Sequence, residues 1–212
     1  MGGSDPSQAT AVAPGLLGGV PTASALAADR ARLLALLTEL SFERRKVTLA
    51  SGRESNFYVD CKRTSLTAEG HWLIGRLLLD EIMRISPPVV GVGGLTLGAD
   101  PIASAVATVS FVQGRPLHAF LVRKEPKGHG TGQWVEGLRA VPPGSRVAVV
   151  EDVVTTGGSG LAACERATAE GLVVAGVFAL VDRQEGGREA FEAKGHRLVS
   201  LFTRADFLGQ EG

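Results

Sequence analysis

Two adjacent carboxylates, Glu151 and Asp152, follow an apolar run and precede a loop rich in hydroxyl groups and glycine. Residues 147–159 read VAVVEDVVTTGGS, and a helical pattern begins at Leu161. In an open α/β sheet, ligands bind beyond the carboxyl end of a strand, where backbone N–H groups and a helix N-terminus hold phosphate. Paired carboxylates repel a phosphate, so we expect them to accept hydrogen bonds from sugar hydroxyls beside it. The stretch therefore predicts a ribose-phosphate site.

The loop after the acidic pair has the composition of a phosphate-binding turn. Gly157 and Gly158 let the backbone approach a ligand closely, and the hydroxyls of Thr155, Thr156 and Ser159 supply further donors. Taken alone, the acidic pair is also compatible with a solvated turn, and the glycines with an ordinary strand-to-helix turn. The order in which these residues occur favours the binding site.

A second group of charged side chains lies in residues 123–137, which read RKEPKGHGTGQWVEG. Four glycines and a proline make this stretch poor material for a helix or a buried strand, and we predict a long mobile loop. Long loops inside compact domains are usually functional lids. The basic side chains of residues 123–137 could also belong to a solvated loop with no function. They are Arg123, Lys124, Lys127 and His129.

Composition limits the classes of protein to which the chain can belong. Its 212 residues fit one α/β domain, and equal numbers of basic and acidic side chains give a formal net charge of zero. There is thus no global field for nucleic acid or for an anionic membrane, and we expect neither partner. No apolar run reaches the roughly 20 residues of a membrane span, so we expect a cytoplasmic protein. The two cysteines, Cys61 and Cys164, lie far apart and predict reduced thiols.

Periodicity predicts an alternation of strands and helices, which is typical of a parallel sheet with right-handed crossovers. Residues 1–22 lack periodic apolar positions and predict a disordered leader, so residues 23–212 form the single domain. A helix from Ala25, with Ser24 as candidate cap, and two short strands precede the main sheet. The expected strands cover 46–49, 57–60, 89–92, 117–122, 147–150, 173–181 and 198–202, and the later helices 67–85, 102–109, 160–170 and 188–194.

The residues quoted above resemble the type I phosphoribosyltransferases. VAVVEDVVTTGGS is similar to that family's phosphoribosyl-pyrophosphate motif, and three further segments resemble the orotate phosphoribosyltransferases within it. The resemblance spans about residues 40–208. It implies the α/β type I fold: a mainly parallel central sheet flanked by helices, a small N-terminal helix and strand subdomain, and a mobile catalytic lid. The segments are VTLASGRESNFYVDCK at 47–62, VRKEPKGHGTGQWVEG at 122–137 and LVDRQEGG at 180–187.

The resemblance also implies roles for individual side chains. Glu151 and Asp152 are expected to hold the ribose hydroxyls, with Lys127, His129 and Asp152 as catalytic residues. Arg183 and Thr155 are expected to contact orotate, although Arg183 could instead be an ion-pair partner of Asp182 or Glu185. The residues expected to bind phosphoribosyl pyrophosphate are Arg123, Lys124, Lys127, His129, Glu151, Asp152, Val153, Val154, Thr155, Thr156, Gly157, Gly158 and Ser159.

The implied reaction transfers the phosphoribosyl group to orotate, giving orotidine 5′-monophosphate and pyrophosphate in pyrimidine biosynthesis. Mg²⁺ is expected to arrive with phosphoribosyl pyrophosphate, and no residue of the chain is assigned as a metal ligand. A homodimer is expected in which each lid reaches the neighbouring subunit's site. Two alternatives are a phosphoribosyltransferase for another base and a regulator that senses phosphoribosyl pyrophosphate.

The sequence departs from the family pattern on the diphosphate side. Many members have lysine where Ala50 stands, and an aromatic residue followed by lysine where Leu97 and Gly98 stand. Those members use both lysines on the diphosphate. The resemblance therefore leaves more of the neutralisation to Arg123, Lys124 and Lys127.

Overall fold

The computed structural model describes residues 19–44, 47–48, 54–55, 57–126 and 133–208. Its centre is a six-stranded sheet in the order β10–β9–β8–β5–β6–β7, in which all neighbours are parallel except β6 and β7. The mainly parallel sheet predicted from the sequence is thus confirmed. The strands are β5 (Gly91–Leu95), β6 (His118–Val122), β7 (Val135–Glu136), β8 (Arg146–Val154), β9 (Val173–Asp182) and β10 (Leu198–Thr203).

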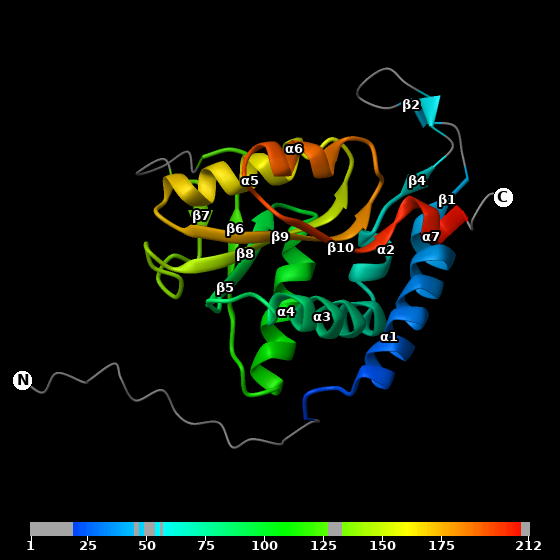
Figure 1. Cartoon of the computed structure of the whole chain (residues 1–212), viewed down its shortest axis with the longest axis horizontal. Helices are drawn as coiled ribbons and strands as arrows, with labels where there is room; N and C mark the ends of the chain where they lie inside the picture. The colour runs from blue at the N-terminus through cyan, green and yellow to red at the C-terminus, as the bar shows by residue number, and fades with distance from the viewer. Residues whose placement is uncertain (1–18, 45–46, 49–53, 56, 127–132, 209–212) are drawn as a thin grey trace, which may run out of the picture.

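Helices cover both faces of this sheet, as expected for parallel strands that are apolar on both sides. Along β8, Val147 and Val149 belong to one buried cluster, whereas Ala148 and Val150 belong to the other. The helices α5 (Gly158–Ala169) and α6 (Gly187–Ala193) cover the first face, and α3 (Ala68–Ile82) and α4 (Ala99–Val112) cover the second (Figure 1). The alternation shows the two-residue period of a strand buried between two layers.

A smaller unit stands at one end of the sheet (Figure 1). Two short antiparallel pairs form there, β1 with β4 and β2 with β3. The side chain of Phe207 packs on the rings of Phe42 and Phe57 with centroids 5.6 Å apart in both cases. Its elements are α1 (Ala23–Leu36), the π-helical turn η1 (Leu37–Ser41), β1 (Phe42–Glu43), β2 (Val47–Thr48), β3 (Glu54–Ser55), β4 (Tyr58–Val59), α2 (Lys62–Ser65) and the C-terminal α7 (Arg204–Leu208).

Local predictions at the N-terminal side were partly right. Thr67 caps α3 by accepting a hydrogen bond from the N–H of Gly70, at the start of the helix expected over 67–85. The cap of α1, however, is Thr22 and not Ser24, because the helix begins two residues earlier than predicted, at Ala23. Of the predicted leader, residues 1–18 lie outside the described part of the chain.

The stretch 123–137 contains a strand that the sequence did not indicate. Val135 is fully buried and pairs with Val122, so β7 closes onto β6 as an antiparallel edge. The glycines and proline of the stretch indicate a loop, and only two residues form the strand. Their pairing depends on a tertiary contact with β6, which the local sequence does not predict. The described loop is therefore shorter than expected, and residues 127–132 fall outside the described chain.

Both cysteines are free and buried, which agrees with the reduced thiols expected. In the part of the chain that the structure describes, no helix is both long and apolar enough to cross a membrane.

Candidate functional site

Glu151, Asp152 and the loop that follows them lie next to the point in the sheet where the strand order reverses, between β5 and β8. From β5 the chain continues to β6 and β7 on one side, whereas β8 is followed by β9 and β10 on the other. Crevices at the carboxyl ends of strands next to such a reversal are the usual ligand sites of α/β sheets. Residues 96–98 follow β5 here, and Glu151 and Asp152 lie near the carboxyl end of β8.

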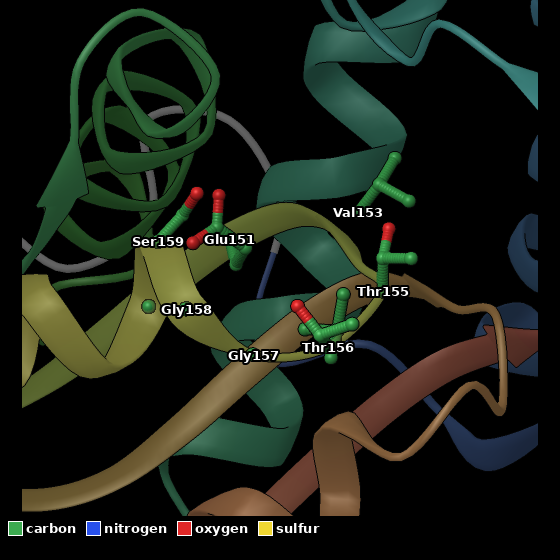
Figure 2. Close-up of a pocket in the computed structure, with 9 residues that line it drawn as sticks. Glu151, Val153, Thr155, Thr156, Gly157, Gly158 and Ser159 are labelled. Atoms are coloured by element: carbon green, nitrogen blue, oxygen red, sulfur yellow. The ribbon is translucent and has the colours of Figure 1, made fainter. Parts of the chain in front are cut away.

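A pocket of about 180 Å³, here called the phosphate pocket, lies between the end of β8 and the start of α5. Gly157 precedes the helix with φ of +84°, a left-handed conformation that glycine adopts without strain. No side chain caps α5, so its first N–H groups are left for a ligand. Figure 2 shows the loop wrapping the pocket, with Glu151 and Ser159 side by side. The lining residues are Glu151, Val153, Val154, Thr155, Thr156, Gly157, Gly158, Ser159 and Gly160.

Glu151 is the buried member of the acidic pair. Its side chain lies in the phosphate pocket with the residue only 5% exposed, and within the described chain its Oε2 has no hydrogen-bond partner. Burial, with the neighbouring Asp152 carboxylate, raises the pKa of Glu151 from 4.5 to about 8. At neutral pH Glu151 is therefore largely uncharged, which reduces its repulsion of a phosphate.

A second pocket, of about 270 Å³, adjoins the first and shares Glu151 and Ser159 with it. We call it the lysine pocket, because Lys62 and Lys124 both line it. Lys124 was predicted, and its positive charge acts on Glu151 to favour the carboxylate. Lys62 was not predicted; it comes from α2 in the N-terminal subdomain. The other lining residues are Leu95, Thr96, Leu97, Gly98 and Asp152.

Arg123 lies next to Lys124 but has partners away from the lysine pocket. Its Nη1 is 3.2 Å from Glu136 Oε1 on β7, and its carbonyl accepts a hydrogen bond from Arg166. The guanidinium of Arg166 stacks over Trp134, 4.2 Å from the ring centroid, which makes Trp134 an anchor for the base of the loop. The predicted residues Lys127 and His129 lie outside the described residues.

Arg183 follows β9 and lies beside the loop after β8. Its backbone N–H donates to the carbonyl of Val154, immediately before Thr155. The guanidinium is buried, forms an ion pair with Glu185 at 3.0 Å, and donates to the carbonyl of Phe57. Of the two ion-pair partners that the sequence offered for Arg183, the structure shows Glu185. The other, Asp182, pairs with Arg188. The predicted contact of Arg183 with orotate stays a prediction.

Comparison with known proteins finds that the chain is similar to orotate phosphoribosyltransferases. No family model matches the sequence. The chain is 53% identical over 182 residues to the orotate phosphoribosyltransferase of Sorangium cellulosum (strain So ce56), covering 86% of this chain and 94% of that protein. A crystal structure of Mycobacterium tuberculosis H37Rv orotate phosphoribosyltransferase in complex with Fe(III) dicitrate matches with 44% identity and a TM-score of 0.73, covering 84% of this chain and 98% of that chain. A structure of the same enzyme with 5-phospho-alpha-D-ribosyl 1-diphosphate matches with 43% identity and a TM-score of 0.69, over the same shares of the two chains.

Replacing Glu151 by glutamine should stabilise the fold, and more so at high pH. The folded protein holds the Glu151 proton up to a pKa of about 8, whereas the ordinary value is 4.5, so this group's contribution to stability declines as pH rises between those values. Because each pKa unit corresponds to about 1.4 kcal/mol, Glu151→Gln should raise the free energy of unfolding by a few kcal/mol at pH 9 and by little at pH 5. Urea unfolding at both pH values measures this.

The matched control is Glu165→Gln on α5, whose carboxylate is 70% exposed and should give no such pH dependence. An equal effect of Glu151→Gln at pH 5 and pH 9 would contradict the raised pKa.

Proposed function

The chain belongs to the orotate phosphoribosyltransferase family, and we propose a division of the site, in which different residues bind different parts of that enzyme's substrates. The enzyme transfers the phosphoribosyl group of phosphoribosyl pyrophosphate to orotate, giving orotidine 5′-monophosphate and pyrophosphate. The observation that supports the division is the meeting of the phosphate pocket and the lysine pocket at Glu151 and Ser159. Two anion-binding pockets joined at an acidic pair match a substrate that carries phosphate groups on both sides of a ribose.

In this division, the phosphate pocket holds the 5′-phosphate. The uncapped start of α5 offers backbone N–H groups and the positive end of a helix dipole, and Thr155, Thr156 and Ser159 add hydroxyls. Glu151 and Asp152 then face the ribose, where carboxyl oxygens accept hydrogen bonds from its hydroxyls. The buried Glu151 Oε2, unpaired within the described chain, supports that role because a ribose hydroxyl would supply the missing donor.

The lysine pocket receives the diphosphate in the same division. As the bond from the anomeric carbon to pyrophosphate breaks and a bond to a ring nitrogen of orotate forms, negative charge grows on the leaving group. A cation fixed beside that charge stabilises the transition state more than the ground state. Lys124 lines the pocket, and Lys127 and His129 are proposed to join it from the loop.

Mg²⁺ is proposed to enter with the substrate. Among the described residues no group of three or more potential ligands could hold a metal. The carboxylate of Asp152, which lines the lysine pocket, does fit an ion that is bound mainly by substrate oxygens, since Mg²⁺ is often held by one or two carboxylates plus phosphates. When bound there, the ion supplies charge neutralisation to the diphosphate.

A direct test of the activity mixes the protein with orotate, phosphoribosyl pyrophosphate and Mg²⁺ and follows the loss of orotate absorbance. We expect turnover with orotate and none with adenine, guanine or uracil. Turnover with another base only would favour the first alternative considered from the sequence. Binding of phosphoribosyl pyrophosphate without any turnover would favour the regulator.

Arg183 is proposed to bind the carboxylate of orotate, because a guanidinium pairs with a carboxylate through two parallel hydrogen bonds. Arg183→Ala should raise the KM for orotate roughly tenfold to a hundredfold, in line with a lost charged hydrogen bond, and should leave the KM for phosphoribosyl pyrophosphate nearly unchanged. Steady-state kinetics with each substrate varied in turn gives both values.

Removal of Arg183 alone leaves Glu185 buried without this ion-pair partner, which could disturb the fold. The double variant Arg183→Ala, Glu185→Gln removes both charges and serves as the matched control. Equal losses for both substrates in the double variant would count against the orotate contact.

We further propose a homodimer in which Lys127 and His129 of each loop at 123–137 serve the neighbouring subunit's site, while Lys124 stays in the lysine pocket of its own subunit. Support comes from the family resemblance and from Leu97, an apolar side chain 71% exposed in the wall of the lysine pocket, which a partner subunit would cover.

Mixing two inactive variants tests the shared loop. Lys127→Ala disables the loop, and Asp152→Asn disables the ribose site. If loops are shared, mixed dimers contain one site with both parts intact, so random mixing should restore about a quarter of wild-type activity per site, since half of the dimers are mixed and one site in each is complete. No recovery in proven mixed dimers would show that each loop serves its own subunit.

A further inference from the structure

Lys62 brings a cation to the reaction site from a different part of the fold than the predicted basic loop. It is the first residue of α2, in the N-terminal subdomain, and lines the lysine pocket together with Lys124 from the end of β6. The two lysines that line the pocket therefore come from separate elements of the fold. The acidic pair at the end of β8 and the backbone of residues 96–98 complete it.

Gly98 lies in the loop after β5, next to the side chain of Asp152. A Cβ atom on Gly98 would lie 2.5 Å from Asp152 Oδ1 and 2.6 Å from Asp152 Cγ, closer than real Cβ atoms come to their neighbours. The Asp152 carboxylate thus occupies the space that a side chain at position 98 would need. A side chain at position 98 would require Asp152 to shift, and glycine supplies no charge there, so the lysines that line the pocket come from other elements.

The charge of Lys62 is fixed in place before any ligand binds. Its Nζ lies 2.7 Å from Asp60 Oδ1, and the hydrogen bond to Asp60, together with the charge of Asp152, raises the pKa of the Lys62 amine. The side chain is still 44% exposed. An ammonium has three donors, so two remain for a ligand after Asp60 has taken one. Holding a cation in position beforehand lowers the entropy cost of binding.

We propose that Lys62 binds the diphosphate group of phosphoribosyl pyrophosphate, together with Lys124, and so helps to neutralise the leaving group. This role rests on the proposed function of the lysine pocket as the diphosphate side of the site. It assigns to the N-terminal subdomain a direct part in substrate binding. Asp60 is then a positioning residue, which holds the Lys62 amine toward the pocket.

The test compares Lys62→Met, which removes the charge at similar length, with Lys62→Arg, which keeps it. Two probes are titrated separately by calorimetry, inorganic pyrophosphate with Mg²⁺ and ribose 5-phosphate. Lys62→Met should weaken pyrophosphate binding about tenfold, because one charge-assisted hydrogen bond is lost. It should leave ribose 5-phosphate binding unchanged. Lys62→Arg should retain most of the affinity for pyrophosphate. The KM for phosphoribosyl pyrophosphate should follow the pyrophosphate result, while the KM for orotate stays constant.

Lys194→Met on the far end of α6 is the matched control, because Lys194 is 62% exposed and lines neither pocket. Unchanged pyrophosphate binding in Lys62→Met would overturn the proposal, as would equal weakening of both probes, which would indicate a structural role. Failure of the proposed function is a separate result, since it would appear as no turnover of orotate by the wild-type protein.

Discussion

A carboxyl group buried at the end of the central strand is the constraint on which the rest of the site depends. Glu151 lies where β8 gives way to the loop before α5, and within the described residues no donor satisfies its Oε2. A fold that only needed stability would place an apolar residue there, because burying a carboxyl group without a partner costs free energy. The position makes sense for a ligand that brings its own hydroxyl groups, and the two pockets meet at this side chain.

Electrostatics around the pair explain how a chain of zero net charge can bind a highly charged substrate. The positive groups are local: Lys62 and Lys124 line one pocket, and the start of α5 lines the adjoining pocket, with Glu151 shared by both. The raised pKa of Glu151 removes about one negative charge at neutral pH. Burial of the Glu151 carboxyl lowers the stability of the fold and serves the binding of the substrate. Such a trade-off is common at functional sites.

Sequence reasoning succeeded where a local pattern determined the structure. The strand, acidic pair, glycine turn and helix of 147–169 are contiguous, so their order alone predicted a strand that leads through a tight turn into a helix. The binding of phosphate there stays a prediction. The role of Lys62 could not be inferred in this way. Its neighbours in the pocket are 33 or more residues away along the chain, and only the packing of the subdomain against the sheet brings them together. The same holds for β7, whose pairing with β6 directs Arg123 toward Glu136.

The central claim is the orientation of the substrate across the acidic pair, and a crystal structure of the protein with phosphoribosyl pyrophosphate and Mg²⁺ tests it most directly. We predict the 5′-phosphate within hydrogen-bonding distance of the backbone N–H groups of residues 157–159, ribose hydroxyls at Glu151 and Asp152, and the diphosphate in the lysine pocket. A substrate bound in the opposite direction, with its diphosphate on the loop before α5, would contradict the account.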